Sequence, residues 1–344
     1  MQRPTRTLAS AHISRSDYGF AYTFMTAFGC ATLPPDTPFA ERFAEHHHIP
    51  CVAATVTHFP DGEFELQWPP EHLHASMILV ASTATTPDQS VHDRLMQLVF
   101  GIHQLKTAGV NTCIGVIPYL AYARSDKRST PTSLMGLNIV MQHLQQAGLD
   151  ALLTVDVHTP AALHNAFAGP SWSVDATAQM ADALRGHLPD DEPLAVCAPD
   201  AGAWRRARAW ADALAPHRSA ATELALVHKQ RVHPDQVTEE AFTGTVEGRT
   251  VVVVDDMIST GGTMAQAIRA CRKRGAKTVW AAVTHGLFLN EAPTRLIEAG
   301  LDGLLVANTL SADRITGTPI AECTHYVDVA PLCAQRIDRV WMRR

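Results

Sequence analysis

Short runs of hydrophobic residues alternate with longer amphipathic stretches along most of the chain. The runs 77–81, 112–117 and 251–254 are almost wholly apolar, a pattern typical of strands that are buried on both faces of a parallel sheet. Stretches such as 89–108 instead repeat apolar residues at helical spacing and end near a glycine. The recurring unit of helix, glycine and buried strand predicts an α/β fold with mainly parallel sheets flanked by helices.

The same unit occurs in both halves of the chain, and 344 residues are enough for two domains. We therefore predict two α/β domains in tandem, an N-terminal one over 27–170 and a C-terminal one over 171–344. Residues 1–26 are basic and rich in Ser and Thr, with Asp17 as the only acid. A transit peptide has that composition, but we interpret the segment as a poorly ordered N-terminal extension.

Charged residues stand directly after many of the buried runs. The carboxyl ends of parallel strands meet at one edge of a sheet, where α/β proteins usually bind ligands, so we expect these side chains to converge. Phosphoryl-type chemistry needs such a mixture, because cations neutralise phosphate charge and carboxylates can hold Mg²⁺. The residues concerned are Asp61, Glu63, Arg124, Asp126, Asp156, His158, Asp200, Lys229, Arg231, Asp255 and Asp256.

The most informative stretch is the one that begins with the β-branched run 251–254. It continues through Asp255 and Asp256 into Ser-Thr-Gly-Gly-Thr at 259–263, and a helix is expected from about Met264. The glycines let the backbone turn sharply and point its N–H groups inward, and the helix adds its positive N-terminal end. A phosphate is expected on this loop, with the paired carboxylates on sugar hydroxyls or a metal. An ordinary strand, turn and helix is the alternative, because Gly-Gly and Asp-Asp pairs are both common.

Composition narrows the class of protein further. Hydrophobic residues make up 46% and charged residues 18%, which describes a soluble globular protein, and no apolar run approaches the length of a membrane span. The net charge of −6 argues against nucleic acid or an anionic membrane as the main partner. Seven scattered cysteines without a C-x-x-C pair indicate reduced thiols in a cytoplasmic protein, and suggest neither a disulfide framework nor a zinc site.

Six motifs stand in a fixed order along the chain: Phe59-Pro-Asp-Gly-Glu63, Pro118-Tyr-Leu-Ala-Tyr-Ala-Arg124, Val155-Asp-Val-His158, Pro199-Asp-Ala-Gly202, His228-Lys-Gln-Arg231 and Asp255-Asp-Met-Ile-Ser-Thr-Gly-Gly-Thr263. This series resembles that of ribose-phosphate pyrophosphokinases, and type I phosphoribosyltransferases are similar only in the last motif. The resemblance implies two tandem domains of the type I phosphoribosyltransferase fold. It also implies transfer of the β,γ-diphosphoryl group of MgATP to the C1 hydroxyl of ribose 5-phosphate, which gives phosphoribosyl diphosphate and AMP.

The resemblance also implies a role for each motif residue. The implied ATP-binding residues are Phe59, Asp61, Glu63, Arg124 and Asp126, of which the first three would act across a subunit interface. The implied Mg²⁺ ligands are His158 and Asp200, and the implied catalytic cations are Lys229 and Arg231. The implied ribose 5-phosphate site comprises Asp255, Asp256, Ser259, Thr260, Gly261, Gly262 and Thr263. A homodimer or hexamer is implied as the assembly.

The chain departs from the family pattern at several positions. Ser125 stands where the family has Gln, and Ser259 stands where it has an acid. Ala203 replaces the second glycine of a turn, where a positive φ would be costly for it. The segment after Arg128 is shorter than usual, and Leu-Asn-Glu at 289–291 replaces Ser-Gly-Pro. These changes indicate a divergent branch, in which phosphate regulation and substrate preference can differ.

Two other functions stay open from the sequence. A non-catalytic paralogue that regulates an active enzyme is disfavoured because Lys229, Arg231, His158 and Asp200 are all retained. A phosphoribosyltransferase that uses phosphoribosyl diphosphate with a base is disfavoured by the motifs at 59–63 and 155–158.

Overall fold

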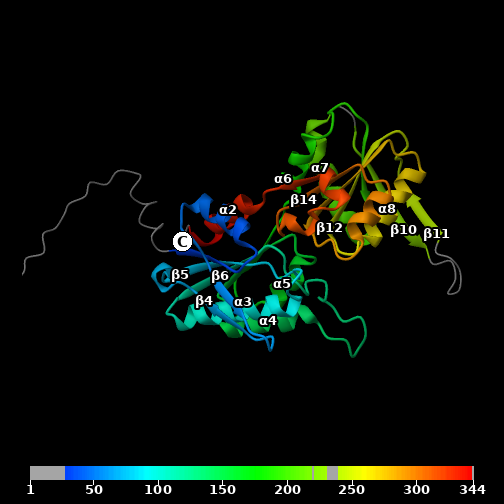
Figure 1. The fold of residues 1–344 in the computed structure, drawn as a ribbon. Helices are drawn as coiled ribbons and strands as arrows, with labels where there is room; N and C mark the ends of the chain where they lie inside the picture. The colour runs from blue at the N-terminus through cyan, green and yellow to red at the C-terminus, as the bar shows by residue number, and fades with distance from the viewer. Residues whose placement is uncertain (1–27, 219–220, 231–238, 343–344) are drawn as a thin grey trace, which may run out of the picture.

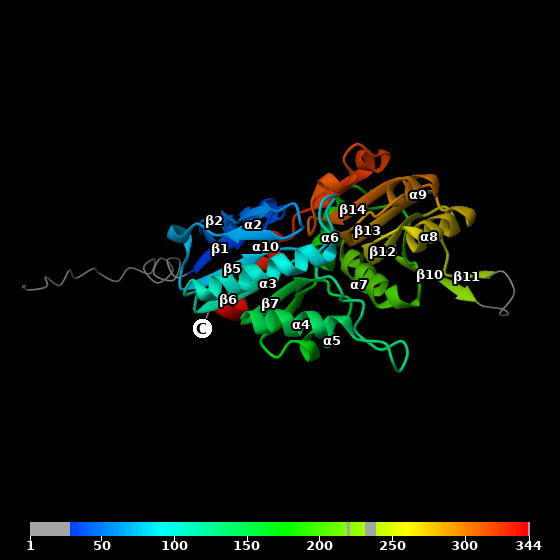
Figure 2. The ribbon, with the colours of Figure 1, turned by 60° about the horizontal axis from the view of Figure 1, so that its bottom comes forward.

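The structure is a computed structural model that describes residues 28–218, 221–230 and 239–342. Two α/β units make up this part of the chain, as Figure 1 shows, and Figure 2 gives a second view. Within the described residues, no helix is both long and apolar enough to span a bilayer.

The first unit is built on a parallel sheet with the strand order β2-β1-β5-β6-β7-β8. Helices α3 (Val91–Thr107), α4 (Gly136–Ala147) and α5 (Pro160–Ala166) cover one face, and α2 (Thr37–His47) packs on the other. Apolar side chains on both faces explain why the inner strands read as continuous hydrophobic runs. The strands are β1 (Phe28–Thr32), β2 (Cys51–Ala53), β5 (Ser76–Val80), β6 (Thr112–Ile117), β7 (Ala151–Val155) and β8 (Ser171–Val174).

The second unit is built on a sheet with the order β11-β10-β9-β12-β13-β14-β15, parallel except for the pair β10 and β11. Its helices are α6 (Thr177–Arg185), α7 (Trp204–Leu214), α8 (Gly262–Lys273) and α9 (Ala292–Glu298). The predicted fold of two tandem, mainly parallel α/β sheets is therefore confirmed. The strands are β9 (Leu194–Ala198), β10 (Glu223–Gln230), β11 (Glu239–Thr243), β12 (Thr250–Ile258), β13 (Thr278–Gly286), β14 (Gly303–Ala307) and β15 (Thr324–Val327).

Some elements differ from the sequence prediction. The polar pattern of 239–243 predicts a loop, but these residues form β11, because their backbone pairs with the otherwise open edge of β10. Strand β12 runs on through the two acids to Ile258, because β13 continues beside it to Gly286. The apolar spacing predicts a helix over 132–147, but α4 begins only at Gly136, since the Ser133 hydroxyl bonds the preceding backbone into a turn.

The two units share elements at their boundary. Strand β8 pairs with β7, so the first sheet extends past the boundary expected after residue 170. The last helix, α10 (Ala330–Ile337), returns from the second unit and packs against α2, as the red and blue helices of Figure 1 show. Its buried residues Cys333, Ala334 and Ile337 join a core cluster that includes side chains of both units. The first unit is therefore completed by the C-terminal end of the chain.

A two-stranded hairpin stands apart from both sheets. The Pro-Asp-Gly sequence at 60–62 predicts a hairpin turn, and strands β3 (Thr55–His58) and β4 (Phe64–Gln67) pair antiparallel as that turn requires. Gly62 takes a φ of 94° in this turn. The Phe64 ring lies 5.1 Å from the Phe100 ring of α3, so the hairpin packs on that helix next to its turn.

Candidate functional site

The predicted site residues of the second unit surround a cleft of about 460 Å³ at the carboxyl ends of the strands. Arg124 and His158 enter it from the loops after β6 and β7 of the first unit, so both units contribute. This is the edge at which open α/β sheets bind ligands. The residues that line it are Arg124, His158, Asp200, Gly202, Ala203, Arg206 and 255–264.

The loop 259–263 joins β12 to α8 and is held in shape from behind. Gly261 has a φ of 72°, and a Cβ at this position would lie 3.3 Å from the Cβ of Ala292 in α9. The Leu289 N–H donates to the Ser259 carbonyl at 2.9 Å, and the Arg295 guanidinium donates to the Thr260 carbonyl. A fixed turn ahead of a helix N-terminus suits an anion such as a phosphate.

Asp256 and His158 are joined by a hydrogen bond between the two units. The His158 Nδ1 lies 2.7 Å from Oδ2 of Asp256, and this hydrogen bond raises the pKa of His158. Burial opposes the charge on Asp256, but the bond from His158 and the charge of Arg206 outweigh it and lower the pKa of Asp256. The Nδ1–H of His158 therefore donates to a charged Asp256, and Nε2 offers a lone pair to a metal when the ring is neutral.

Asp255 has the opposite electrostatic environment. Burial, together with the negative charge of Asp256, raises the pKa of Asp255 to about 7, and Asp200 adds to the effect. A cation placed among these carboxylates would relieve the repulsion. The cleft is thus able to attract a positive ion even though it also contains arginines.

The carboxylates fit Mg²⁺ that arrives with a phosphate-bearing substrate. Within the described residues, no group of three or more His, Cys, Asp and Glu side chains is arranged to hold a metal alone. Mg²⁺ commonly takes one or two carboxylates and completes its shell with substrate phosphates and water. Of the two predicted ligands, Asp200 lies exposed at the cleft, whereas the Nδ1 of His158 is occupied by Asp256. Only Nε2 of His158 is left to face a metal.

Arg206 is a cleft residue to which the sequence analysis gave no role. Its guanidinium lies 3.6 Å from Asp156, whose carboxylate also accepts hydrogen bonds from the Thr284 hydroxyl and the Ala176 N–H. Its charge acts on Asp156, Asp255 and Asp256 and favours their ionised forms. The sequence offers one signal, namely that Arg206 lies in the first turn of the helix after the Asp200 turn. The same signal applies to Arg205, which does not line the cleft.

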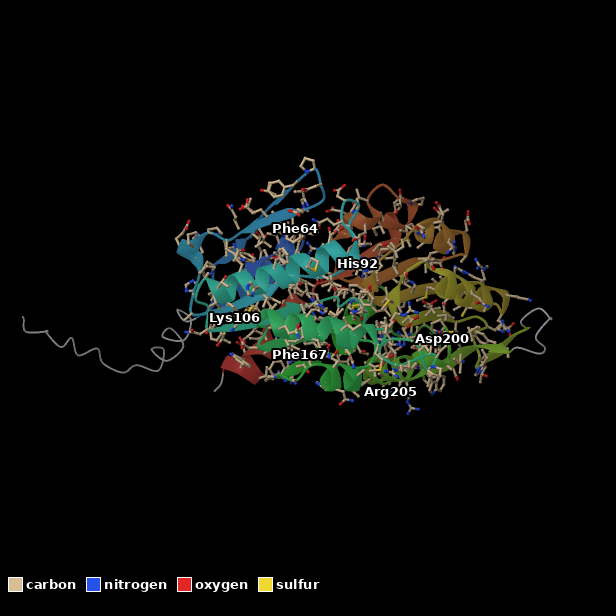
Figure 3. The ribbon with its side chains drawn as sticks, turned by 90° about the horizontal axis from the view of Figure 1, so that it is seen from below. Phe64, His92, Lys106, Phe167, Asp200 and Arg205 are labelled. Carbon is tan, nitrogen blue, oxygen red and sulfur yellow. The ribbon has the colours of Figure 1, made fainter. Side chains whose placement is uncertain are left out.

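The hairpin residues are not brought to this cleft within one chain. Phe59 is 44% exposed, and Asp61 and Glu63 are exposed as well. Figure 3 shows Phe64, the residue that follows the turn of the hairpin, far from Asp200. Their predicted contact with ATP therefore requires a second copy of the chain or a large movement.

Three further predicted residues have different outcomes. Asp126 does not line the cleft, although its charge contributes to the raised pKa of His158. Lys229 belongs to β10, in register with Glu240 of β11, and Arg231 lies outside the described residues.

The backbone strain expected at Ala203 is wrong, because the φ of Ala203 is −81° and any residue can adopt that conformation.

The departure at Ser125 has a local structural role. Its hydroxyl accepts a hydrogen bond of 2.9 Å from the N–H of Gly136, the first residue of α4. Ser125 therefore satisfies an N–H group at the start of a helix, and such groups otherwise lack partners. Its side chain does not line the cleft.

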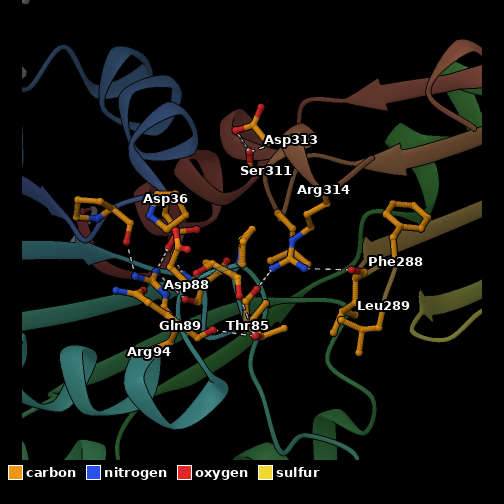
Figure 4. A pocket seen from close by; sticks show the side chains of 18 of the residues that line it. Asp36, Thr85, Asp88, Gln89, Arg94, Phe288, Leu289, Ser311, Asp313 and Arg314 are labelled. Atoms are coloured by element: carbon orange, nitrogen blue, oxygen red, sulfur yellow. Dashed lines mark hydrogen bonds and ion pairs between the residues drawn. The ribbon is translucent and has the colours of Figure 1, made fainter. Parts of the chain in front are cut away.

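A second cavity of about 600 Å³ lies between the two units and contains none of the predicted site residues. Figure 4 shows Arg314 at its centre, where the guanidinium donates to the carbonyls of Thr85 and Leu287. Arg94 is buried at one end and pairs with Asp36 at 2.5 Å. The bond from Arg314 to Thr85 connects a loop of the second unit to a loop of the first.

Comparison with known proteins identifies relatives of both units. Residues 31–148 match the N-terminal domain of ribose phosphate pyrophosphokinase, and residues 173–299 match the phosphoribosyl transferase domain. The ribose-phosphate pyrophosphokinase of Deinococcus radiodurans is 30% identical over 303 residues, which cover 88% of this chain and 91% of that protein. The one from Methanopyrus kandleri is 34% identical over 269 residues, 78% of this chain and 88% of that protein.

A solved structure is similar along nearly the whole length. The crystal structure of phosphoribosylpyrophosphate synthetase from Mycobacterium smegmatis matches with a TM-score of 0.80 and 29% sequence identity. The match covers 92% of this chain and 99% of that one, so it includes both units and the elements that they share.

Proposed function

Because the chain belongs to the ribose-phosphate pyrophosphokinase family, we propose that it transfers the β,γ-diphosphoryl group of ATP to the C1 hydroxyl of ribose 5-phosphate. The products are 5-phosphoribosyl 1-diphosphate and AMP. The observation that carries the proposal is the single cleft in which a phosphate-binding loop, three carboxylates and two arginines meet. The scattered free thiols suit a cytoplasmic enzyme.

The acceptor sugar occupies the side of the cleft formed by the second unit. The loop 259–263 holds the 5-phosphate through its N–H groups, and Asp255 and Asp256 accept hydrogen bonds from the ribose hydroxyls. The hydrogen bond from His158 keeps Asp256 charged and in one orientation. This arrangement directs C1 of the sugar toward the carboxyl ends of β9 and β7.

The transfer requires charge neutralisation more than a covalent nucleophile. The C1 oxygen attacks the β-phosphorus, the bond from that phosphorus to the α,β-bridging oxygen breaks, and AMP leaves. Asp200, with Nε2 of His158, would hold Mg²⁺, which when bound neutralises phosphate charge. Arg124 and Arg206 line the cleft and add fixed positive charge, and we assign Lys229 and Arg231 to the β-phosphate and the departing AMP.

Self-association would complete the nucleotide site. Large apolar side chains are exposed along α3, α4 and the loop before α4, beside the hairpin: Met96, Phe100, Tyr122, Leu134 and Ile139. A second copy that covers this apolar surface could bring its own hairpin residues to the cleft. We therefore propose a homodimer or a larger homo-oligomer, in which Phe59, Asp61 and Glu63 contact ATP bound to the neighbouring subunit.

The proposal is tested by incubating the purified protein with ribose 5-phosphate, ATP and Mg²⁺. We expect AMP and phosphoribosyl diphosphate in equal amounts, and no AMP when either the sugar phosphate or Mg²⁺ is omitted. A folded protein that binds ribose 5-phosphate but releases no AMP under varied metal and phosphate would point to the non-catalytic paralogue. Consumption of phosphoribosyl diphosphate with a nucleobase would point to a phosphoribosyltransferase.

A further inference from the structure

Two cysteines of the first sheet are direct neighbours on adjacent strands. Cys30 of β1 and Cys51 of β2 are register partners in a parallel pair, so both side chains point to the same face. Adjacent strands lie about 4.8 Å apart, within the roughly 4.4–6.8 Å of Cα separation that a disulfide spans. All seven cysteines of the chain are free thiols in the structure.

The two thiols differ in exposure and in acidity. Cys51 is half-buried on the edge strand, whereas Cys30 is buried beneath α2 and its thiol contacts the Ala40 carbonyl. The neighbouring Cys30 thiol lowers the pKa of Cys51, whereas the Cys51 thiol and burial raise the pKa of Cys30. Cys51 is thus the better nucleophile of the pair, because the thiolate is the form that reacts with oxidants.

We propose that Cys51 is a peroxide-reactive thiol and that Cys30 resolves it, forming a reversible disulfide between β1 and β2. The Cys51 thiolate attacks one oxygen of hydrogen peroxide, the O–O bond breaks, and hydroxide leaves as water once protonated. The Cys30 sulfur then attacks the resulting sulfenic acid, forming the S–S bond and releasing a second water molecule. Two thiols lose two electrons to one peroxide, and a dithiol reductant reverses the step.

A second thiol pair in the same chain provides an internal control. Cys197 of β9 and Cys271 of α8 are also neighbours, since the Cys271 thiol raises the pKa of Cys197, but neither side chain has exposed surface. If exposure on the edge strand decides reactivity, the pair 30/51 reacts and the pair 197/271 does not.

The position of the pair 30/51 also has a structural consequence, since β2 ends at Ala53 and the hairpin strand β3 begins at Thr55. The disulfide would fix the base of the hairpin.

The test is peptide mapping of the folded full-length protein without reduction, after a brief exposure to a few equivalents of hydrogen peroxide. We expect one major cross-linked pair, containing Cys30 and Cys51 and lighter than the separate peptides by two hydrogen atoms, which dithiothreitol cleaves. Hydrogen exchange at the β2 amides should slow at the same time. Oxidation of Cys51 without a link to Cys30, or a 197/271 link that forms as fast, would overturn the proposal.

Two variants separate the roles of the thiols. In Cys30→Ala we expect Cys51 to accumulate as a sulfenic acid that a 1,3-diketone reagent traps, and in Cys51→Ala we expect Cys30 to stay reduced. Equal trapping at Cys30 in Cys51→Ala would contradict the assignment. Peptide mapping of the peroxide-treated wild-type protein tests the 30/51 disulfide even if a variant folds poorly. None of these measurements depends on turnover, so their failure is distinct from a failure of the proposed reaction.

Discussion

His285 is a buried histidine that connects the two units behind the cleft. Its Nε2 lies 3.0 Å from the carbonyl of Val155 and its Nδ1 lies 2.9 Å from the hydroxyl of Thr309. Because a carbonyl only accepts, Nε2 carries the proton, and the Thr309 hydroxyl lies within hydrogen-bond distance of both Nδ1 and the Thr284 carbonyl. Burial lowers the pKa of His285 to about 4, so the ring stays neutral near pH 7.

This pKa predicts how the stability of the protein depends on pH. Below pH 6.5 the unfolded chain protonates His285 but the folded protein does not, so its contribution to stability falls as the pH drops toward 4. Between pH 7 and pH 5 the loss is about 2 kcal/mol. We expect the difference in unfolding free energy between wild type and His285→Gln, measured in urea, to shrink by that amount. Asp36, with its pKa raised to about 6 by burial, acts in the opposite sense and is common to both proteins. A pH-independent difference would contradict the assignment.

Arg206 is the cleft residue whose role is easiest to isolate. We expect Arg206→Met to lower kcat about 100-fold, as removal of one preorganised charge from an active site typically does. Arg205→Met is the matched control, since Arg205 is adjacent in the chain but exposed and outside the cleft. Steady-state kinetics of both variants measures the two kcat values, and circular dichroism confirms that both proteins are folded. Equal kcat values for the two variants would remove Arg206 from the proposed mechanism.

At the residue scale, the motifs singled out Arg124, His158, Asp200, Asp255 and Asp256, and the structure places all five in one cleft. It could not find Arg206, because an arginine in the first turn of a helix is common and nothing in the chain distinguishes it from Arg205. The role of Asp156 was also hidden. Its side-chain partners Arg206 and Thr284 lie 50 and 128 positions further along the chain, so only the fold brings them together.

At the scale of elements, the phosphate-binding loop depends on one left-handed residue. We expect Gly261→Ala to destabilise the protein by about 1–2 kcal/mol, because a side chain at a φ of 72° is strained and would press on Ala292. Gly262→Ala is the control, since a Cβ there meets nothing within 4 Å and its φ is not positive. Thermal unfolding of the two variants without ligand makes the comparison. A Gly262 variant that is destabilised as strongly as the Gly261 variant would show that the strain argument is wrong.

The hairpin is the element whose predicted function depends on a second chain. We expect Phe59→Ala to raise the KM for ATP about fivefold, which corresponds to the ~1 kcal/mol that an aromatic stacking contact contributes. The KM for ribose 5-phosphate and the melting temperature should stay unchanged, because the ring is exposed in the isolated chain. An unchanged KM for ATP would separate the hairpin from the nucleotide site.

Hydrophobic periodicity predicted most strands and helices, because the apolar pattern that indicates a buried strand or helix lies within the segment itself. It could not predict β11, whose Glu-Glu-Ala-Phe-Thr sequence forms a strand only because β10 offers it an open edge. Nor could it extend β12 through the two acids, since that extension depends on the length of β13. Both misses arise from pairing between strands, which a pattern along one segment does not contain.

At the scale of the whole molecule, the apolar surface on α3 and α4 predicts self-association. We expect Leu134→Glu to shift the protein toward the monomer mass, because this 61% exposed leucine would place a charge on the proposed contact. Trp204→Glu is the control, since Trp204 is also exposed but lies on α7 of the second unit. Light scattering coupled to gel filtration gives both masses. A monomeric wild-type protein, or equal effects of the two variants, would contradict the proposal.

The domain layout shows what the sequence could not convey at this scale. The repeated α/β unit suggested a boundary near residue 170, yet β8 and α10 both complete the first unit from beyond it. Their apolar residues are equally compatible with the second unit. Only the pairing of β8 with β7 and the packing of α10 on α2 reveal where they belong.

The central claim is that this chain transfers a diphosphoryl group, and following the β-phosphorus of ATP tests it most directly. With ATP labelled at the β-phosphorus, ribose 5-phosphate and Mg²⁺, the account predicts that the label moves to the sugar product while unlabelled AMP is released in equal amount. Release of labelled ADP would mean that only the γ-phosphoryl group is transferred. Labelled ADP, or intact ATP after incubation with the folded protein, would contradict diphosphoryl transfer.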